Sequence, residues 1–254
     1  MKMFDLSVFW EANHYAEPWP PEVYWSSGEE QAEILGNKLG IQADDFRDRT
    51  ALAAEHVKGE VLFHVGTHCD APIHFGPTCE GKPSRTIDEL PIEDFYGDGV
   101  IIDVRHKGSR EEITVDDIQK ALADINYTIK PKDIVLIMTG MDKYIYTDKY
   151  LYKQPGMGEA ATRWLIDQGV KLTGIDAYTW DRPFSAMVED VKAGHKEKLF
   201  PAHFVGRDKE YYHIEKLCNL ETVPIRYGFK VSAFPIKVKN GSAGYCRVVA
   251  MVGD

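Results

Sequence analysis

The pattern of apolar and polar positions predicts short buried strands separated by helices. Residues 99–104 and 133–138 are almost continuously apolar, which is typical of central strands covered on both faces of a sheet. Shorter apolar runs at 61–65 and 170–177 predict two more strands. Strands mixed with a few helices indicate an α/β or mixed α+β domain.

Two further strands are expected at the end of the chain. Residues 229–238 and 245–252 are strand-like and flank the dipeptide Asn240-Gly241. Asn-Gly supplies the positive φ angles of a tight turn, so this pattern predicts a hairpin.

Helical periodicity is clearest in two segments. Thr114 can cap a helix over 114–125 and Asp117 can complete a capping box, since the two are three residues apart. The apolar stripe of this helix consists of Ile118, Leu122 and Ile125. A second helix is expected over 158–169, ended by Gly169.

Composition indicates one ordinary globular domain. Apolar residues make up 44% and charged residues 28% of the 254 residues, values typical of folded chains. No repeat or low-complexity linker divides the sequence, and a chain of this length can bury a substantial core, so a single domain over 1–254 is expected. The formal charge of −10 argues against nucleic acid or an anionic membrane as partner.

The segment at the start of the chain does not have the pattern of a signal peptide, because residues 1–15 lack a basic start followed by an apolar core. No apolar run approaches the roughly 18 residues of a membrane span. The four cysteines form no Cys-x-x-Cys pair and no disulfide framework. A cytoplasmic location is therefore expected.

The densest chemistry of the sequence lies in the run from His64 to His74. It contains His64, His68, Asp70 and His74, all at even offsets within eleven residues. Neutral imidazole nitrogens and a carboxylate oxygen are ligands that zinc and manganese accept. The run therefore predicts a site for a divalent metal.

The same run cannot be a straight strand or a regular helix. In a strand His64 and His68 would stand roughly 13 Å apart, too far to share one ion. Gly66 and Pro72 argue against a helix. A bend at Gly66-Thr67 is expected, because glycine permits a bulge or a tight turn.

This run resembles a family signature. It reads His-x-Gly-Thr-His-x-Asp-x-Pro-x-His, like the cyclase-like metal-dependent hydrolases, which include bacterial kynurenine formamidase and isatin hydrolase. Residues 5–7 with 17–20, 87–90 with 97–104, and 215–220 also look like the family, so the likeness covers most of the chain. It implies the cyclase-like swivelling β/β/α fold, with a central mixed β-sheet or barrel and flanking helices.

The resemblance also implies the ligands. His64, His68 and Asp70 would hold a first ion, and Asp70, His203 and Glu215 a second. The metal would be Zn²⁺ or Mn²⁺, with one or two ions per chain. The alternative for His203 and Glu215 is a place in a charged surface loop.

The family assigns the position of His74 to proton transfer, and an imidazole with a pKa near 6.5 suits that role. The alternatives for His74 are a third ligand or a residue that orients one.

Two further residues are candidates for substrate binding. Trp19 can form an aromatic wall or simply pack in a rigid turn. His213 shares a strand face with Glu215 if residues 211–215 are extended, and it either reaches the pocket or packs in the core. Asp176 and Asp181 end a strand and can orient ligands, although for Asp181 an ordinary turn with Arg182 is slightly favoured.

The resulting prediction is an enzyme that hydrolyses the C–N bond of a small amide with metal-activated water. The leading substrate class is an aryl formamide such as N-formylkynurenine, in tryptophan catabolism. A cyclic amide, imide or lactone of the isatin-hydrolase type is a close alternative. A catalytically silent metal-binding protein of the same fold is a third. The family's habit also implies a homodimer or a higher homo-oligomer.

Overall fold

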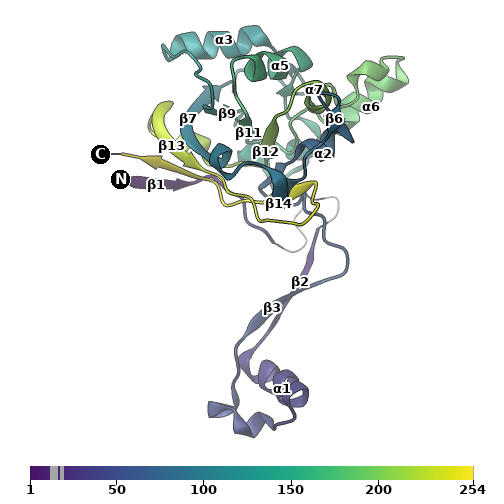
Figure 1. Cartoon of the computed structure of the whole chain (residues 1–254), viewed down its shortest axis with the longest axis vertical. Helices are drawn as coiled ribbons and strands as arrows, with labels where there is room; N and C mark the ends of the chain where they lie inside the picture. Colours follow the sequence, from purple (N-terminus) through teal and green to yellow (C-terminus); the bar gives the residue numbers. More distant parts are fainter. Residues whose placement is uncertain (12–16, 18–19, 254) are drawn as a thin grey trace. The chain divides into compact units, whose positions relative to one another are not determined.

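The computed structural model describes residues 1–11, 17 and 20–253 (Figure 1). The chain groups into two compact units. One consists of Met1–Trp10 with Phe63–Asp254, and the other of Glu11–Leu62. The expectation of one domain over 1–254 stays a prediction, and Trp19 lies outside the described residues.

The smaller unit, residues 11–62, contains a two-stranded sheet and a helix. β2 (Glu22–Ser26) pairs antiparallel with β3 (Ala54–Lys58), and α1 (Gly28–Leu39) follows β2. Ser27 and Glu30 form a reciprocal capping box at the start of this helix, which satisfies two backbone donors that the first turn leaves free.

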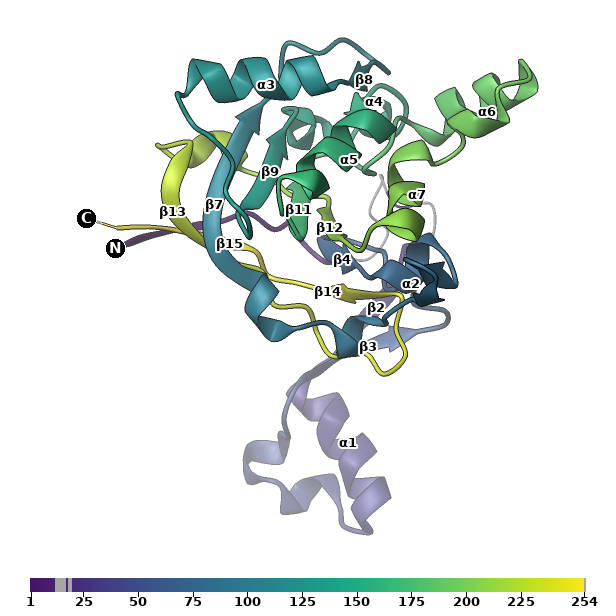
Figure 2. The same ribbon diagram turned by 45° about the horizontal axis from the view of Figure 1, so that its top comes forward.

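The larger unit is built on a curled sheet of nine strands (Figure 2). Its four central strands run parallel to one another, and the outer strands are antiparallel to their neighbours. In spatial order the strands are β1 (Lys2–Asp5), β15 (Val249–Val252), β13 (Tyr227–Ser232), β7 (Tyr96–Asp103), β9 (Ile134–Met138), β11 (Leu172–Ile175), β12 (Tyr212–Glu215), β4 (His68–Asp70) and β14 (Ala243–Tyr245).

Helices and two small strand pairs complete this unit. α3 packs against α5 and β7, and α5 packs against α7, which contacts α2. The helices are α2 (Pro72–Phe75), α3 (Val115–Asp124), α4 (Asp148–Tyr152), α5 (Glu159–Asp167), α6 (Phe184–Lys192) and α7 (Pro201–Asp208); the pairs are β5 (Thr78–Cys79) with β6 (Lys82–Pro83) and β8 (Glu112–Ile113) with β10 (Gly156–Met157). Within the described residues, no helix has the length and apolar character needed to cross a membrane.

The apolar runs and the helical periodicity locate several elements correctly. The predicted strands at 99–104, 133–138, 170–177 and 211–215 correspond to β7, β9, β11 and β12. The predicted helices are α3 and α5. Thr114 caps α3 through a capping box with Asp117, as expected.

Two predicted strands need correction. Residues 61–65 are not a strand; the chain turns there, and the strand β4 begins only at His68. The predicted bend is confirmed, since Gly66 has a φ of 64°, which favours glycine.

The expected C-terminal hairpin is also only partly right. β13 does pair antiparallel with β15, but β14 lies between them in sequence and pairs with β4 instead. Asn240 takes a positive φ of 57° in the intervening turn. In this position β14 covers the edge of β4, which would otherwise expose unpaired backbone groups.

Strand alternation separates the apolar core from the polar cluster. On β12, Tyr212 and Ile214 belong to the main apolar core, and on β4 so does Cys69. Successive side chains of a strand point to opposite faces. The neighbouring residues of these strands therefore face the other side of the sheet, where the site is built.

Candidate metal centre

The antiparallel ladder between β4 and β12 is the frame of the site. His213 lies opposite Asp70, and Glu215 lies opposite His68. Directly opposed residues share one face of a sheet. The pairing therefore brings four ligand-type side chains together, although 145 positions of sequence separate Asp70 from Glu215.

Three more histidines come from the segments around this ladder. His64 lies on the turn before β4, His74 on α2 and His203 on α7. Pro72 occupies the first turn of α2, where its missing N–H costs nothing. The chain between His64 and Asp70 is thus a turn and a strand, as predicted, and not a helix.

These side chains form two overlapping groups that share Asp70. Asp70, His203, His213 and Glu215 each offer a ligand atom within 4.8 Å of the others, and so do His64, Asp70 and His74. His68 also borders the cluster, because its Nε2 lies 3.3 Å from Asp70 Oδ1 and 3.7 Å from Glu215 Oε2.

The approaches of the histidines to the carboxylates are short. His64 Nδ1 lies 2.8 Å from Asp70 Oδ1, and His213 Nε2 lies 3.1 Å from Asp70 Oδ2. His203 Nε2 lies 3.5 Å from Glu215 Oε1. His74 is more distant, since its Nε2 lies 3.9 Å from Asp70 Oδ2.

Burial makes this cluster costly without a cation. His68, Asp70 and His213 have no solvent exposure. Among the described residues, both carboxylate oxygens of Asp70 and the Nε2 atoms of His68 and His213 have no hydrogen-bond partner of acceptable geometry. Buried polar atoms are normally paired, so these atoms point to a missing positive charge between them.

The tautomers of the histidines lead to the same conclusion. His68 Nδ1 lies 2.8 Å from the carbonyl of Gly66 and can only donate to it. His213 Nδ1 lies 3.3 Å from the Tyr211 hydroxyl, whose own proton goes to the carbonyl of Ala202. When neutral, each ring therefore presents the lone pair of Nε2 to the carboxylates. Two lone pairs facing two carboxylates need a cation, and the donor set fits a divalent metal.

The pKa values of Asp70 and His213 also indicate that the cluster favours positive charge. Burial opposes ionisation of Asp70, yet the nearby histidines His74, His64 and His68 hold its pKa well below the usual range. Burial likewise disfavours a charged His213, but Asp70 and Glu215 raise its pKa to about 9.

His74 behaves differently from His213. Burial lowers the pKa of His74 to about 4, despite the attraction of Asp70. Its side chain is 35% exposed, compared with 17% for His64 and less for the other members of the cluster. A neutral imidazole on the open side of the cluster can accept a proton.

Asp181 holds His203 in place, which corrects the sequence analysis, where an ordinary turn is favoured. Its carboxylate accepts the backbone N–H groups of Ala202 (2.8 Å) and His203 (3.1 Å) and pairs with His203 Nδ1. It thus caps α7 and directs Nε2 of His203 to the cluster, the usual role of a carboxylate behind a metal-binding histidine. Asp176 instead accepts the backbone N–H groups of Thr139 and Gly140.

The buried loop of residues 177–181 orients the Glu215 carboxylate. Glu215 Oε1 accepts the Trp180 N–H at 2.7 Å and the Thr179 hydroxyl at 3.0 Å. Gln154 is fully buried and braces this loop, because its amide accepts from Tyr178 N and donates to two loop carbonyls. No local pattern marks Gln154, since its contacts lie more than 20 residues away.

The structure therefore brings together every predicted site residue that it describes. His64, His68, Asp70, His74, His203 and Glu215 lie in one cluster. His213, a candidate for substrate binding, lies in the middle of the candidate ligands, where its ring stacks on Trp180 at a centroid distance of 5.2 Å.

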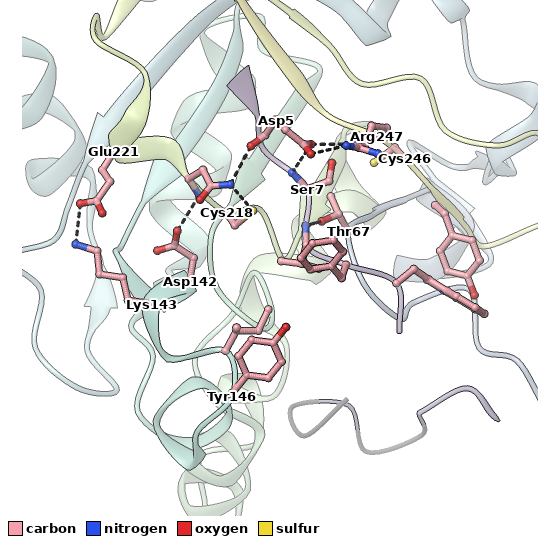
Figure 3. Close-up of a pocket in the computed structure, with 16 residues that line it drawn as sticks. Asp5, Ser7, Thr67, Asp142, Lys143, Tyr146, Cys218, Glu221, Cys246 and Arg247 are labelled. Carbon is pink, nitrogen blue, oxygen red and sulfur yellow. Dashed lines mark hydrogen bonds and ion pairs between the residues drawn. The ribbon is translucent and has the colours of Figure 1, made fainter. Parts of the chain in front are cut away.

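A separate cavity of about 640 Å³ lies in the same unit (Figure 3). Its described lining includes Thr67, Asp142, Cys218 and the ion pair of Asp5 with Arg247. None of the clustered ligand-type residues named above lines it. Lys143 pairs with Glu221, and Asp142 accepts the backbone N–H of Asn219, so the charged side chains that line this cavity have partners among the described residues.

Comparison with known proteins identifies the family. The model of the family described as "Putative cyclase" matches residues 4–182. The chain belongs to this family.

Curated relatives include a kynurenine formamidase of Erythrobacter litoralis, 27% identical over 186 residues, which are 73% of this chain and 72% of the relative. A kynurenine formamidase of Salinibacter ruber is 26% identical over 195 residues, which are 73% of this chain and 74% of the relative. Among solved structures, an isatin hydrolase bound to the product analogue thioisatinate matches with a TM-score of 0.75 and 21% identity, over 100% of this chain and 93% of that chain. The predicted family and fold are thereby confirmed.

Asp181→Asn tests how the cluster is held. The amide cannot match the carboxylate at His203 Nδ1, so we expect divalent metal affinity to fall about 10- to 100-fold, measured by competition with a chromophoric chelator. Asp133→Asn is the matched control, because Asp133 is also buried and accepts a backbone N–H, but its partners Lys130 and Tyr127 do not belong to the cluster. Equal affinities of Asp181→Asn and the wild type would contradict this role.

Proposed function

We propose that the protein is a metal-dependent hydrolase that cleaves the C–N bond of a small amide. The observation that carries this proposal is the pair of buried carboxylates, Asp70 and Glu215, which face the lone pairs of several histidines. The relatives named as kynurenine formamidases support it.

His64, His68 and Asp70 are the proposed ligands of a first ion. Asp70, His203 and Glu215 are those of a second, and His213 lies close enough to join them. The proposed metal is Zn²⁺ or Mn²⁺. The two overlapping groups around Asp70 support room for two ions.

A bound divalent ion would act as a Lewis acid: it would polarise the substrate carbonyl and lower the pKa of bound water toward about 7. The protein supplies the proton transfers and the orientation. His74 takes the proton of the attacking water at Nε2 and delivers it to the leaving nitrogen, which departs poorly as an anion. Trp180 and Thr179 keep the Glu215 carboxylate oriented throughout.

Aromatic side chains beside His203 favour an aryl substrate. The Phe200 ring lies 5.9 Å from the His203 ring and 5.5 Å from the Phe184 ring, and Tyr178 continues the series 5.9 Å from Phe184. Phe184 is 41% exposed, so its face is accessible to a flat ring. An aryl formamide such as N-formylkynurenine is the leading substrate class.

A cyclic amide, imide or lactone of the isatin-hydrolase type is the second candidate. The segment from Met141 to Leu199, which carries α4 and α6, is longer than we expect for a compact formamidase. The same aromatic residues suit a fused ring, and ring opening needs the same proton transfer by His74.

Turnover of a panel of aryl formamides, isatin-like rings, cyclic imides and lactones on metal-defined protein tests the proposal. Hydrolysis that disappears on chelation and returns with Zn²⁺ or Mn²⁺ is expected. Metal binding without turnover of any member would instead indicate a catalytically silent metal-binding protein.

His74→Ala separates proton transfer from metal binding. We expect this variant to keep its metal and lose about 10²- to 10⁴-fold in amide hydrolysis, whereas His68→Ala loses metal and activity together. Metal content and kcat are measured on the same preparations. Lactone hydrolysis should suffer less in His74→Ala because its leaving group is better. A metal-free His74→Ala would make His74 a ligand.

Phe200→Leu tests the aryl-binding role. Loss of one aromatic contact should raise KM for an aryl formamide roughly threefold to tenfold and leave KM for an alkyl formamide unchanged. Phe204→Leu is the matched control, because the Arg207 guanidinium covers its ring at 3.4 Å from the centroid. Equal KM changes for both substrate types would exclude Phe200 from ring binding.

We also propose a cytoplasmic homodimer. Large apolar side chains in the unit of residues 11–62 support self-association, since Leu52, Trp25 and Leu39 are 84%, 70% and 65% exposed and exposed apolar groups mark interaction surfaces. Sedimentation velocity at micromolar concentration should give twice the monomer mass of 28.8 kDa. Sedimentation as a 28.8 kDa monomer would contradict this.

A further inference from the structure

Lys216 has an unusual backbone and an unusual environment. It directly follows Glu215 and takes a φ of 59°, a left-handed conformation that is unfavourable for a residue other than glycine. The residue is only 3% exposed, although lysine is almost never buried without a partner. Strain of this kind persists where the surrounding structure requires it, often at functional sites.

The described contacts of Lys216 lead to the turn that carries His64 and to the loop of residues 177–181, which orients Glu215. Its ammonium donates to the carbonyl of His64 at 2.8 Å and lies 4.6 Å from the centroid of the Tyr178 ring. Its backbone N–H donates to the carbonyl of Ala177 at 3.0 Å.

The backbone carbonyl of Lys216 makes a second contact with the turn that begins at His64. It accepts the hydroxyl of Thr67 at 2.6 Å, and Thr67 in turn accepts the backbone N–H of Val8 at 2.9 Å, a contact drawn in Figure 3. Lys216 therefore holds the turn that begins at His64 at both of its ends, once by the side chain and once by the main chain.

We infer that Lys216 is a positioning residue that fixes the His64 ring relative to Glu215 for metal binding. The inference rests on the metal site of the proposed function. The left-handed backbone ends the alternation of β12 directly after Glu215, and the ammonium then anchors the His64 carbonyl. Anchored in this way, the turn keeps His64 Nδ1 2.8 Å from Asp70.

Two other roles make different predictions. If the ammonium acted only through its charge, it would repel a bound cation, and its removal would strengthen metal binding. If it served only overall stability, its removal would lower metal affinity equally with and without the His64 ring.

The experiment is a double-mutant cycle of Lys216→Met and His64→Ala. Metal affinity for Zn²⁺ and Mn²⁺ is measured by chelator competition, and the melting temperature of the metal-free protein is recorded. We expect Lys216→Met to weaken binding at least about 10-fold in the wild-type background and less than about twofold in His64→Ala, because positioning has no effect on an absent ring.

Two further variants complete the design. Lys171→Met is the matched control, since Lys171 also donates to a backbone carbonyl, that of Glu210, in a partly buried setting; its metal affinity should not change. Lys216→Gly removes the ammonium at a position whose φ suits glycine. It should show the same loss of affinity, and it provides a folded variant if Lys216→Met does not fold.

The outcomes separate this inference from the proposed function. A wild-type protein that binds no divalent ion would overturn both. Metal binding that is unchanged or strengthened in the Lys216 variants, or weakened equally in both backgrounds, would overturn the role of Lys216 alone. An unchanged affinity in His64→Ala would overturn the role of Lys216 and would also remove His64 from the proposed ligands.

Discussion

The structure depends most on the burial of two carboxylates side by side. Asp70 is fully buried and Glu215 is 6% exposed, and ionised groups in such positions cost several kcal/mol each unless they are paired. The histidines, the backbone donors of the Trp180 loop and the cap on α7 all surround this pair. The negative charge that these groups leave uncompensated is what supports the proposal of a metal site in this cluster.

Much of the site was predictable because it is local in sequence. The run from His64 to His74 carries its residue types and its bend at Gly66 within eleven positions, and a family signature reinforces them. The central strands β7 and β9 were predictable for a similar reason, since continuous apolar runs need no knowledge of their neighbours. The capping box of α3 also depends on residues three positions apart.

The remaining features depend on pairings that leave no local trace. The register of β4 against β12 joins segments about 145 residues apart, and the departure of β14 to the edge of β4 interrupts a sequence that reads as a simple hairpin. In the sequence, Asp181 looks like part of a turn. Only the structure shows that its carboxylate caps the start of α7. Gln154 and Lys216 act through backbone groups, and a sequence does not show which backbone groups a side chain meets.

The uneven distribution of the candidate ligands has a thermodynamic consequence. Three of the proposed ligands, His64, His68 and Asp70, lie within seven residues and stay close together even in an unfolded chain. His213 and Glu215 join them only when β12 has paired with β4, and His203 only when α7 has packed against α2. Metal that also binds the unfolded state stabilises the fold by less than its affinity for the native site suggests. An ion bound at the proposed site would therefore favour folding only through the contacts that the distant half of the chain adds.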